Sequence, residues 1–312
     1  MTNTLNGSLD VSRLRLLHEV AIRGTIASAA RAVGLTPSAV SQQLAVLERE
    51  AGTRLLDRSP RGVALTGAGH ALADRAAAIL ELLALARADL DRMGGRISGP
   101  VRIAAVASAA ATFVSSAIQK LADTQPGIDV SVITAEPVRS RELLLAGDVD
   151  IAVLDEYDYV PLALPASLVA SELCAEELVV VAPYGRLRRR GSVPLEALRN
   201  WRWVMPPEDA ACGIAVRSAC RAAGFEPRVR WVTDDLLLLV RAVAAGHGVA
   251  VLPRRAVAAD AADVDVRRLV EPILRRRLFA AVRSSAAARP VLQNALAALE
   301  LGAREGEVNR HA

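Results

Sequence analysis

The stretch GLTPSAVSQQLAVLEREAG, residues 34–52, decides the fold of the N-terminal part of the chain. Its second half carries an apolar stripe at positions i, i+4 and i+7, namely Val40, Leu44 and Leu47. This spacing places the three side chains on one face of a helix. Thr36 is a good N-cap with Pro37 at the first helical position, and Gly52 ends the segment. We therefore predict a helix whose uncharged polar residues lie opposite the apolar stripe.

The residues on either side of this helix predict a winged helix-turn-helix. A helix is expected over residues 11–23, whose apolar residues fall on one face. The small residues of TIASAARAV (25–33) favour a second helix that packs closely. Two short strands are expected at 53–58 and 62–66, with a turn between them. Residues 1–65 thus form the expected DNA-binding domain.

The polar start of the helix is suited to the major groove of DNA, where the beginning of a recognition helix enters. Ser and Thr can bond phosphates or base edges, and Gln can pair bidentately with adenine. Residues 11–65 hold eight arginines and four acidic residues, an excess of +4 that equals the formal charge of the whole chain. Taken alone, the pattern also fits a capped, solvent-exposed helix. The candidate DNA-binding residues are Thr36, Pro37, Ser38, Ser41, Gln42 and Gln43, with Arg58 and Arg61 on the wing.

A long helix is expected over residues 66–94, with an apolar seam repeating at 4, 3, 4, 3 spacing. Such a heptad seam requires a partner helix. The alternative is that the seam is buried on the core of the same chain. The candidate dimerisation residues are Leu72, Ile79, Leu83, Ala86 and Leu90.

Residues 95–312 change to alternating buried-type strands and helices, which predicts an α/β domain with a parallel sheet. The pattern restarts about halfway, so two subdomains with a cleft between them are expected. Subdomain I takes about residues 99–170 and 269–300, and subdomain II about 171–268.

The string LRLLHEVAIRGTIASAARAVGLTPSAVSQQLAVLEREAGTRLLDRSPRGVALTGAGHAL (14–72) resembles the winged helix-turn-helix of LysR-type transcriptional regulators. Three later stretches are similar to the same family, and the resemblance covers about residues 9–300. These stretches are GPVRIAA (99–105), LLLAGDVDIAVL (143–154) and VRAVAAGHGVAVLPRRAV (240–257).

The resemblance implies a ligand-responsive regulator of double-stranded promoter DNA with a periplasmic-binding-protein-like effector domain. It implies a homodimer through the linker helices, commonly a tetramer, and a small-molecule effector in the cleft. RNA polymerase stands as a further candidate partner. Because the family's first effector-domain loop lines the cleft, Ser108 and Thr112 are candidate effector-binding residues, with Thr233 on the far side. The amides of that loop could hold an anion, and its alanines suit a smaller or more apolar effector. The alternative is that the side chains of Ser108 and Thr112 only cap their own helix.

The three cysteines, Cys174, Cys212 and Cys220, form no disulfide framework and suit the cytoplasm. Cys212 and Cys220 occupy a region of the chain similar to that of the two cysteines in redox-sensing members of the family. A thiol sensor is therefore an alternative function. Eight residues on one helix rise roughly 12 Å, whereas a disulfide needs Cα atoms within about 7 Å. A structural role for both is therefore expected.

Other residue patterns favour no enzyme. The histidines lack metal-ligand spacing, no nucleotide-binding loop or catalytic set can be assembled, and neither cofactor nor metal is expected. DEYDY (155–159) and RLRRR (186–190) are expected to be solvated loops. An enzyme or solute-binding protein on the same two-lobed fold is the remaining alternative, although no export signal is recognised and the apolar runs fall short of the roughly 20 residues of a membrane span.

Overall fold

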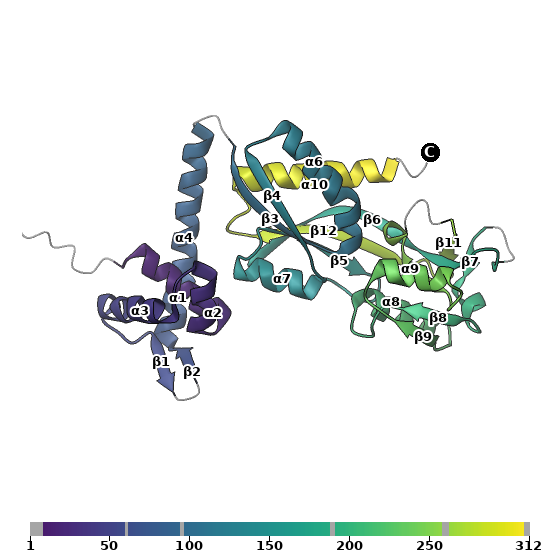
Figure 1. Cartoon of the computed structure of the whole chain (residues 1–312), viewed down its shortest axis with the longest axis horizontal. Coiled ribbons are helices and arrows are strands. Elements are labelled where there is room, and N and C mark those ends of the chain that lie inside the picture. The colour runs from purple at the N-terminus through teal and green to yellow at the C-terminus, as the bar shows by residue number, and fades with distance from the viewer. Residues whose placement is uncertain (1–8, 60–61, 94–96, 188–190, 258–261, 309–312) are drawn as a thin grey trace, which may run out of the picture. The chain divides into compact units, whose positions relative to one another are not determined.

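The computed structural model describes residues 9–59, 62–93, 97–187, 191–257 and 262–308 (Figure 1). The chain divides into two compact units. The first holds Met1–Ile97 with Ser285–Pro290, and the second holds Ser98–Ser284 with Val291–Ala312.

The N-terminal unit is a winged helix-turn-helix, as the sequence predicts. Thr25 and Thr36 cap their helices through hydrogen bonds from the amides of Ser28 and Ala39. The first wing strand begins at Leu56, later than predicted. The elements are α1 (Val11–Arg23), α2 (Ile26–Val33), α3 (Pro37–Ala51), β1 (Leu56–Ser59), β2 (Gly62–Leu65) and α4 (Gly67–Met93).

The apolar stripe of α3 is the centre of this unit. Val40, Leu44 and Leu47 are fully buried and pack with apolar residues of α1, α2 and the start of the wing. Glu48, on the last turns of α3, accepts hydrogen bonds from the amides of Leu55 and Leu56 at 2.9 and 3.0 Å. The orientation of α3 and the start of the wing are therefore fixed together.

The larger unit is built on an eight-stranded sheet with the order β4-β3-β5-β12-β6-β11-β7, and β10 also pairs with β6. β3 runs parallel to β4 and β5, but β12 is antiparallel to β5 and β6. The prediction of a parallel sheet is therefore wrong for this central part. The strands are β3 (Gly99–Ala105), β4 (Ile128–Thr134), β5 (Ile151–Tyr157), β6 (Leu168–Pro183), β7 (Val193–Pro194), β10 (Ala250–Pro253), β11 (Val264–Val270) and β12 (Arg275–Arg283).

The 16-residue strand β6 joins two lobes. Its first part pairs with β12, and its last part pairs with β10 and β11. We call β3, β4, β5 and β12 with their helices lobe I. Lobe II holds β7, β8 (Arg202–Met205), β9 (Arg228–Val232), β10 and β11 with their helices. The sequence-based limit near residue 170 falls inside β6, because that strand contributes to both lobes.

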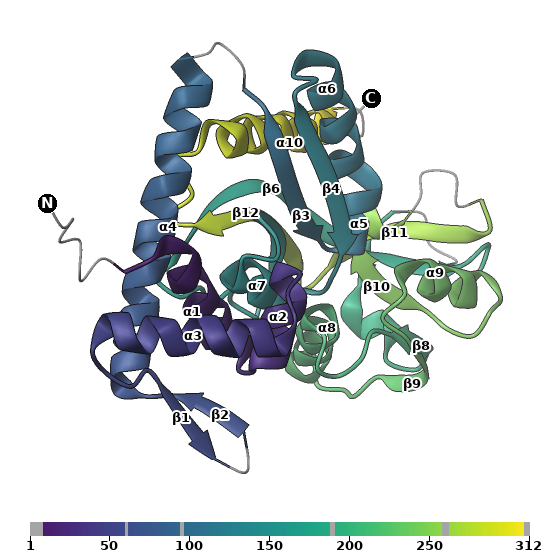
Figure 2. The same ribbon diagram turned by 60° about the vertical axis from the view of Figure 1, so that its left-hand side comes forward.

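Helices cover the sheet in both lobes (Figure 2). The helix that follows β3 starts at Ala107 and includes a π-helical stretch. Lobe I carries α5 (Ala107–Ala109), the π segment Ala110–Val114, α6 (Ser115–Thr124), α7 (Pro137–Ala146) and α10 (Pro290–Val308). Lobe II carries the strands β8 (Arg202–Met205) and β9 (Arg228–Val232), α8 (Ala211–Ala222), α9 (Leu236–Ala244) and two 3-10 turns, Leu195–Leu198 and Arg254–Ala256.

Candidate DNA-binding surface and effector cleft

The first two turns of α3 present polar side chains to solvent. Thr36, Pro37, Ser38 and Gln42 are exposed, and Ser41 is half-buried. The hydroxyls of Thr36 and Ser38 lie 3.1 Å apart. Because the opposite face of α3 is buried in the unit's core, this polar face is a rigid surface available to another molecule.

The other candidate DNA-binding residues are placed differently. Gln43 is exposed, but its Oε1 accepts a hydrogen bond of 2.9 Å from Nε of Arg13 on α1. The same Arg13 is paired with Glu50. Arg58 lies on β1, in register with Val63 of β2. Arg61 lies outside the described residues.

The candidate dimerisation residues separate into two groups along α4. Leu72 is half-buried against the core of its own unit, next to the buried Ala73 and Ala76. Farther along the helix, Ile79, Leu83 and Leu90 are 36%, 48% and 64% exposed, and Ala86 is also exposed. The alternative of burial on the same chain therefore applies to the start of the seam, whereas its second half is an exposed apolar face.

A cavity of about 40 Å³ lies where the two lobes meet. Lobe I contributes residues from the turn after β3, the turn before α7, the end of β5 and the start of β12. Lobe II contributes the segment that leads into α8 and the turn before α9. The polar residues that line the cavity are Ser108, Glu136, Asp155, Tyr157, Asp234 and Arg276.

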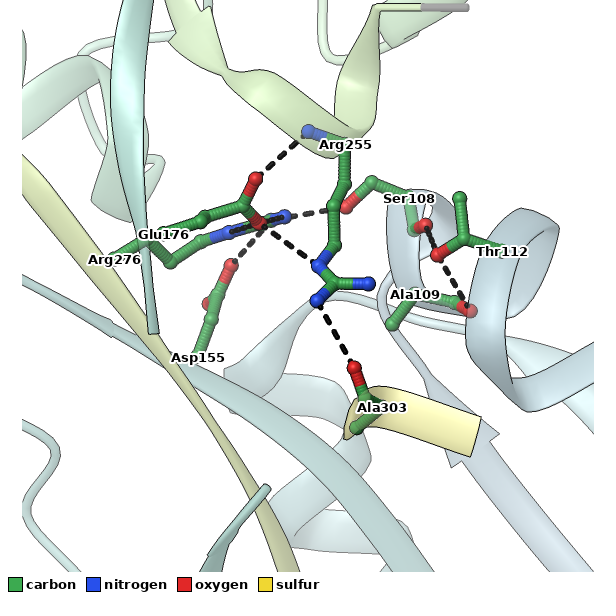
Figure 3. Close-up of polar contacts among 8 residues, drawn as sticks. All are labelled: Ser108, Ala109, Thr112, Asp155, Glu176, Arg255, Arg276 and Ala303. Atoms are coloured by element: carbon green, nitrogen blue, oxygen red, sulfur yellow. Dashed lines mark hydrogen bonds and ion pairs between the residues drawn. The ribbon is translucent and has the colours of Figure 1, made fainter. Parts of the chain in front are cut away.

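Arg276 is the centre of a buried polar cluster behind this cavity (Figure 3). Its Nη1 donates to Oγ of Ser108 at 2.9 Å and to Oδ2 of Asp155 at 3.4 Å. Its Nε and Nη2 donate to Oε1 of Glu176 at 3.1 and 2.5 Å. Glu176 also accepts from the amide of Arg255 at 2.7 Å. A buried charge is stable only when it is paired in this way.

Two carboxyl groups at the cavity are perturbed by their surroundings. Burial raises the pKa of Asp155, although Arg276 lowers it in part. Burial also raises the pKa of Glu136, and repulsion from Asp155 and Asp234 raises it further. One oxygen of Asp155, Oδ1, is buried and has no hydrogen-bond partner among the described residues.

The three candidate effector-binding residues have different surroundings. Ser108 is buried, lines the cavity and accepts from Arg276. Thr112 does not line it; its hydroxyl donates to the carbonyl of Ser108 at 2.7 Å, within its own helical turn. Thr233 is likewise absent from the lining, and its Oγ1 accepts from the amide of Asp235 at 3.2 Å, before α9. The hydroxyls of Thr112 and Thr233 therefore make local contacts at their own helices. Such contacts are the alternative to effector binding that the sequence allows for Ser108 and Thr112.

The expected solvated loop over 155–159 is wrong at its beginning. Asp155 and Tyr157 belong to β5, are buried, and face the cavity. The sequence contained a signal for this placement. Asp155 and Tyr157 lie two positions apart, so on a strand both side chains point to the same face of the sheet. For the run 186–190, only 186–187 fall within the described residues.

Cys212 and Cys220 both lie on α8 and are buried free thiols, and Cys174 on β6 is also buried. Burial raises the pKa of both α8 thiols to about 12. A thiolate is the reactive form of cysteine, so neither residue is activated in this structure. Cys212 nevertheless lines the cavity.

Within the described residues, no cluster of His, Cys, Asp or Glu is arranged to hold a metal ion. In the same part of the chain, no helix combines the length and apolar character needed to cross a bilayer.

Comparisons with known proteins identify the family. The model for "Bacterial regulatory helix-turn-helix protein, lysR family" matches residues 11–70, and the model for the LysR substrate binding domain matches residues 94–303. A probable hydrogen peroxide-inducible genes activator from Streptomyces viridosporus is 28% identical over 300 residues, which is 95% of both chains. The uncharacterised transcriptional regulator YfeR of Shigella flexneri is 27% identical over 276 residues, 86% of both chains.

Solved structures share the whole fold. A full-length OxyR variant from Pseudomonas aeruginosa is similar with a TM-score of 0.70 at 20% identity, covering 95% of both chains. Full-length CbnR in complex with its target DNA gives a TM-score of 0.57 at 22% identity, covering 94% of this chain and 99% of that one. Since the substrate-binding-domain model alone matches more than half of the chain, the protein belongs to the LysR family of bacterial transcriptional regulators.

Proposed function

We propose that the chain binds promoter DNA through the polar face of α3, and that a small molecule in the cleft between the lobes alters this binding. The observation that carries the proposal is the exposure of Thr36, Ser38 and Gln42 on a helix whose opposite face is locked into the core. A helix held rigidly in this way can present its side chains to base edges without losing further conformational freedom. The similar protein CbnR is described in complex with its target DNA.

Individual residues take different parts in this proposal. Ser41 and Gln42 contact base edges from α3, because both lie past the first turn on its polar side. Arg58 and Arg61 contact the sugar–phosphate backbone or the minor groove from the wing. Gln43 has a positioning part, since its side-chain oxygen is engaged by Arg13.

The cleft supplies the regulatory part of the proposal. Residues of both lobes line one cavity, so a ligand there makes contacts that depend on the angle between the lobes. Such a ligand favours one lobe arrangement by its differential affinity for the two. We propose Ser108, Asp155 and Arg276 as the floor of this effector site; Thr112 and Thr233 act on it through their local helix contacts.

The assembly follows from α4. Its exposed leucines pair with the same helix of a second copy, which gives a homodimer, and two dimers form a tetramer. A regulator of promoters works in the cytoplasm, and a sequence with three cysteines and no disulfide framework accords with that compartment. We propose no catalytic activity for the cavity.

The test is fluorescence anisotropy with duplex DNA taken from upstream of the coding sequence. Specific binding that weakens steeply with salt is expected, because phosphate contacts release counterions. Ser41→Ala combined with Arg58→Ala should abolish it, whereas Ser116→Ala combined with Arg304→Ala, exposed in lobe I, should not. Equal binding by the first double variant and the wild type would overturn the proposal.

A further inference from the structure

The buried cluster behind the cavity is balanced in charge. Arg255 and Arg276 supply two positive charges, and Asp155 and Glu176 supply two negative charges. Glu176 receives hydrogen bonds from both arginines, which leaves Asp155 with the longer contact to Arg276. The cluster therefore has no spare positive charge to neutralise other carboxylates that line the cavity.

The rim of the cavity adds two carboxylates from opposite lobes. Glu136 precedes α7 in lobe I, and Asp234 precedes α9 in lobe II. Both line the cavity at its edge. The charged groups that act on Glu136 are Asp155, Asp234 and Arg276, of which the two acids repel it. The cavity thus has an excess of negative charge on both sides of the cleft.

The floor of the cavity offers one acceptor atom that nothing in the described chain satisfies. Asp155 is 7% exposed, lines the cavity, and its Oδ1 has no hydrogen-bond partner. A buried acceptor without a donor costs free energy that a bound donor recovers. The volume of about 40 Å³ suits a single small donor group.

We propose that the effector binds this cavity through a protonated amine or guanidinium group that donates to Asp155 and lies between Glu136 and Asp234. The inference rests on the proposed function, in which the cleft is the effector site, and it adds the chemical class of the effector. The bound cation removes the repulsion between the two rim carboxylates and draws the lobes together. Cleft closure is thereby coupled to the positive charge of the ligand.

An anionic group fits the same cavity poorly. The donors of Arg276 are already directed at Glu176, Asp155 and Ser108, and an anion would face three carboxylates. A divalent metal is also disfavoured, because no metal-holding cluster exists among the described residues. The charges and the unsatisfied acceptor therefore favour an organic cation as the effector. The sequence alone also allows an anion bound by the loop amides.

The experiment is calorimetric titration of the full-length protein with four-carbon probes of different charge, and with a divalent metal salt, at constant ionic strength. The probes are n-butylammonium, n-butylguanidinium, butyrate, butan-1-ol and magnesium chloride. The two organic cations should bind saturably and the other three should not. Asp155→Asn, Glu136→Gln and Asp234→Asn should each weaken cation binding by about fivefold or more, whereas Glu172→Gln, an exposed carboxylate on β6, should leave it unchanged.

Each contrary outcome overturns the inference. Tighter binding of butyrate, butanol or magnesium would do so, as would no binding of either cation or equal binding to all four variants. Anisotropy with the same DNA separates this failure from that of the proposed function. If the wild type binds DNA and the α3 and wing double variant does not, the regulator stands and only the effector class is rejected.

Discussion

Arg276 donates a hydrogen bond of 2.9 Å to the hydroxyl of Ser108, although 168 positions separate the two residues. The contact ties β12 to the turn after β3, and both residues are buried. The same guanidinium holds Glu176 of β6 and Asp155 of β5. One side chain therefore fixes the positions of three strands and of the first loop of the cleft.

Replacing Arg276 with methionine should destabilise the larger unit substantially. The change leaves Asp155 without its counter-charge and Glu176 with Arg255 alone, both buried. Breaking a buried pair by removing one partner costs about 3–5 kcal/mol in free energy of unfolding. Urea unfolding followed by circular dichroism measures it.

The neighbouring Arg277 provides the control for this prediction. It lies on the same strand, is half-exposed, and pairs with Glu156 at the surface. Arg277→Met should cost less than about 1 kcal/mol, because exposed ion pairs are screened by water. Equal losses for the two variants would show that the buried cluster has no special weight in stability.

Asp155 should make the stability of the protein fall as the pH rises. Its pKa in the folded state is raised above 3.8, mainly by burial, so the folded state holds the proton to higher pH than the unfolded state does. The contribution of Asp155 to the free energy of unfolding then declines from pH 3.8 up to and through the raised value. The difference in stability between Asp155→Asn and the wild type should therefore grow more positive with pH.

Asp129→Asn on β4 serves as the matched control, since Asp129 is exposed. Unfolding titrations of the wild type and both variants at several pH values distinguish the cases. A pH-independent difference for Asp155→Asn would mean that this carboxyl is ionised equally in both states.

The α8 thiols should be slow to react in the native protein. The pKa of Cys212 and of Cys220 is raised to about 12 by burial, so at neutral pH nearly all of each thiol is protonated. Mass spectrometry after brief treatment with peroxide or iodoacetamide should find both residues unmodified until the protein is denatured. Two results together would instead support the thiol sensor. Cys212 would be oxidised rapidly in the folded wild type, and a peroxide-dependent change in DNA binding would be absent from Cys212→Ser.

The N-terminal unit could be predicted from the sequence because its determinants are local. Thr25 and Thr36 cap helices that begin at the following residues, and Gly34 and Gly52 end them in the left-handed conformation. The apolar residues of α3 recur at the spacing that places them on one face of a helix. None of these features depends on contacts with distant segments, apart from the core that they jointly bury.

The cavity could not be assembled in the same way, because strand pairing creates it. The register places Arg276 opposite Tyr157 on one neighbouring strand and opposite Glu176 on the other. No local pattern contains this alignment, and the charges of 155–159 suggested solvent instead. β11 could not be predicted for a similar reason, since its charged sequence VDVRRLV gives little sign of the pairing with β6.

The exposed half of α4 should hold the dimer together. Leu83 and Leu90 are 48% and 64% exposed on a helix whose seam has heptad spacing, and burying them against a partner helix is favourable. Leu83→Glu with Leu90→Glu should convert the dimer to a monomer in sedimentation velocity, because four carboxylates would meet in one interface. DNA affinity should fall with it, since two linked recognition helices bind more tightly than one. Tyr184→Glu, a 74% exposed position in lobe II, is the control and should leave the dimer intact. A double variant that remains dimeric would place the interface elsewhere on the chain.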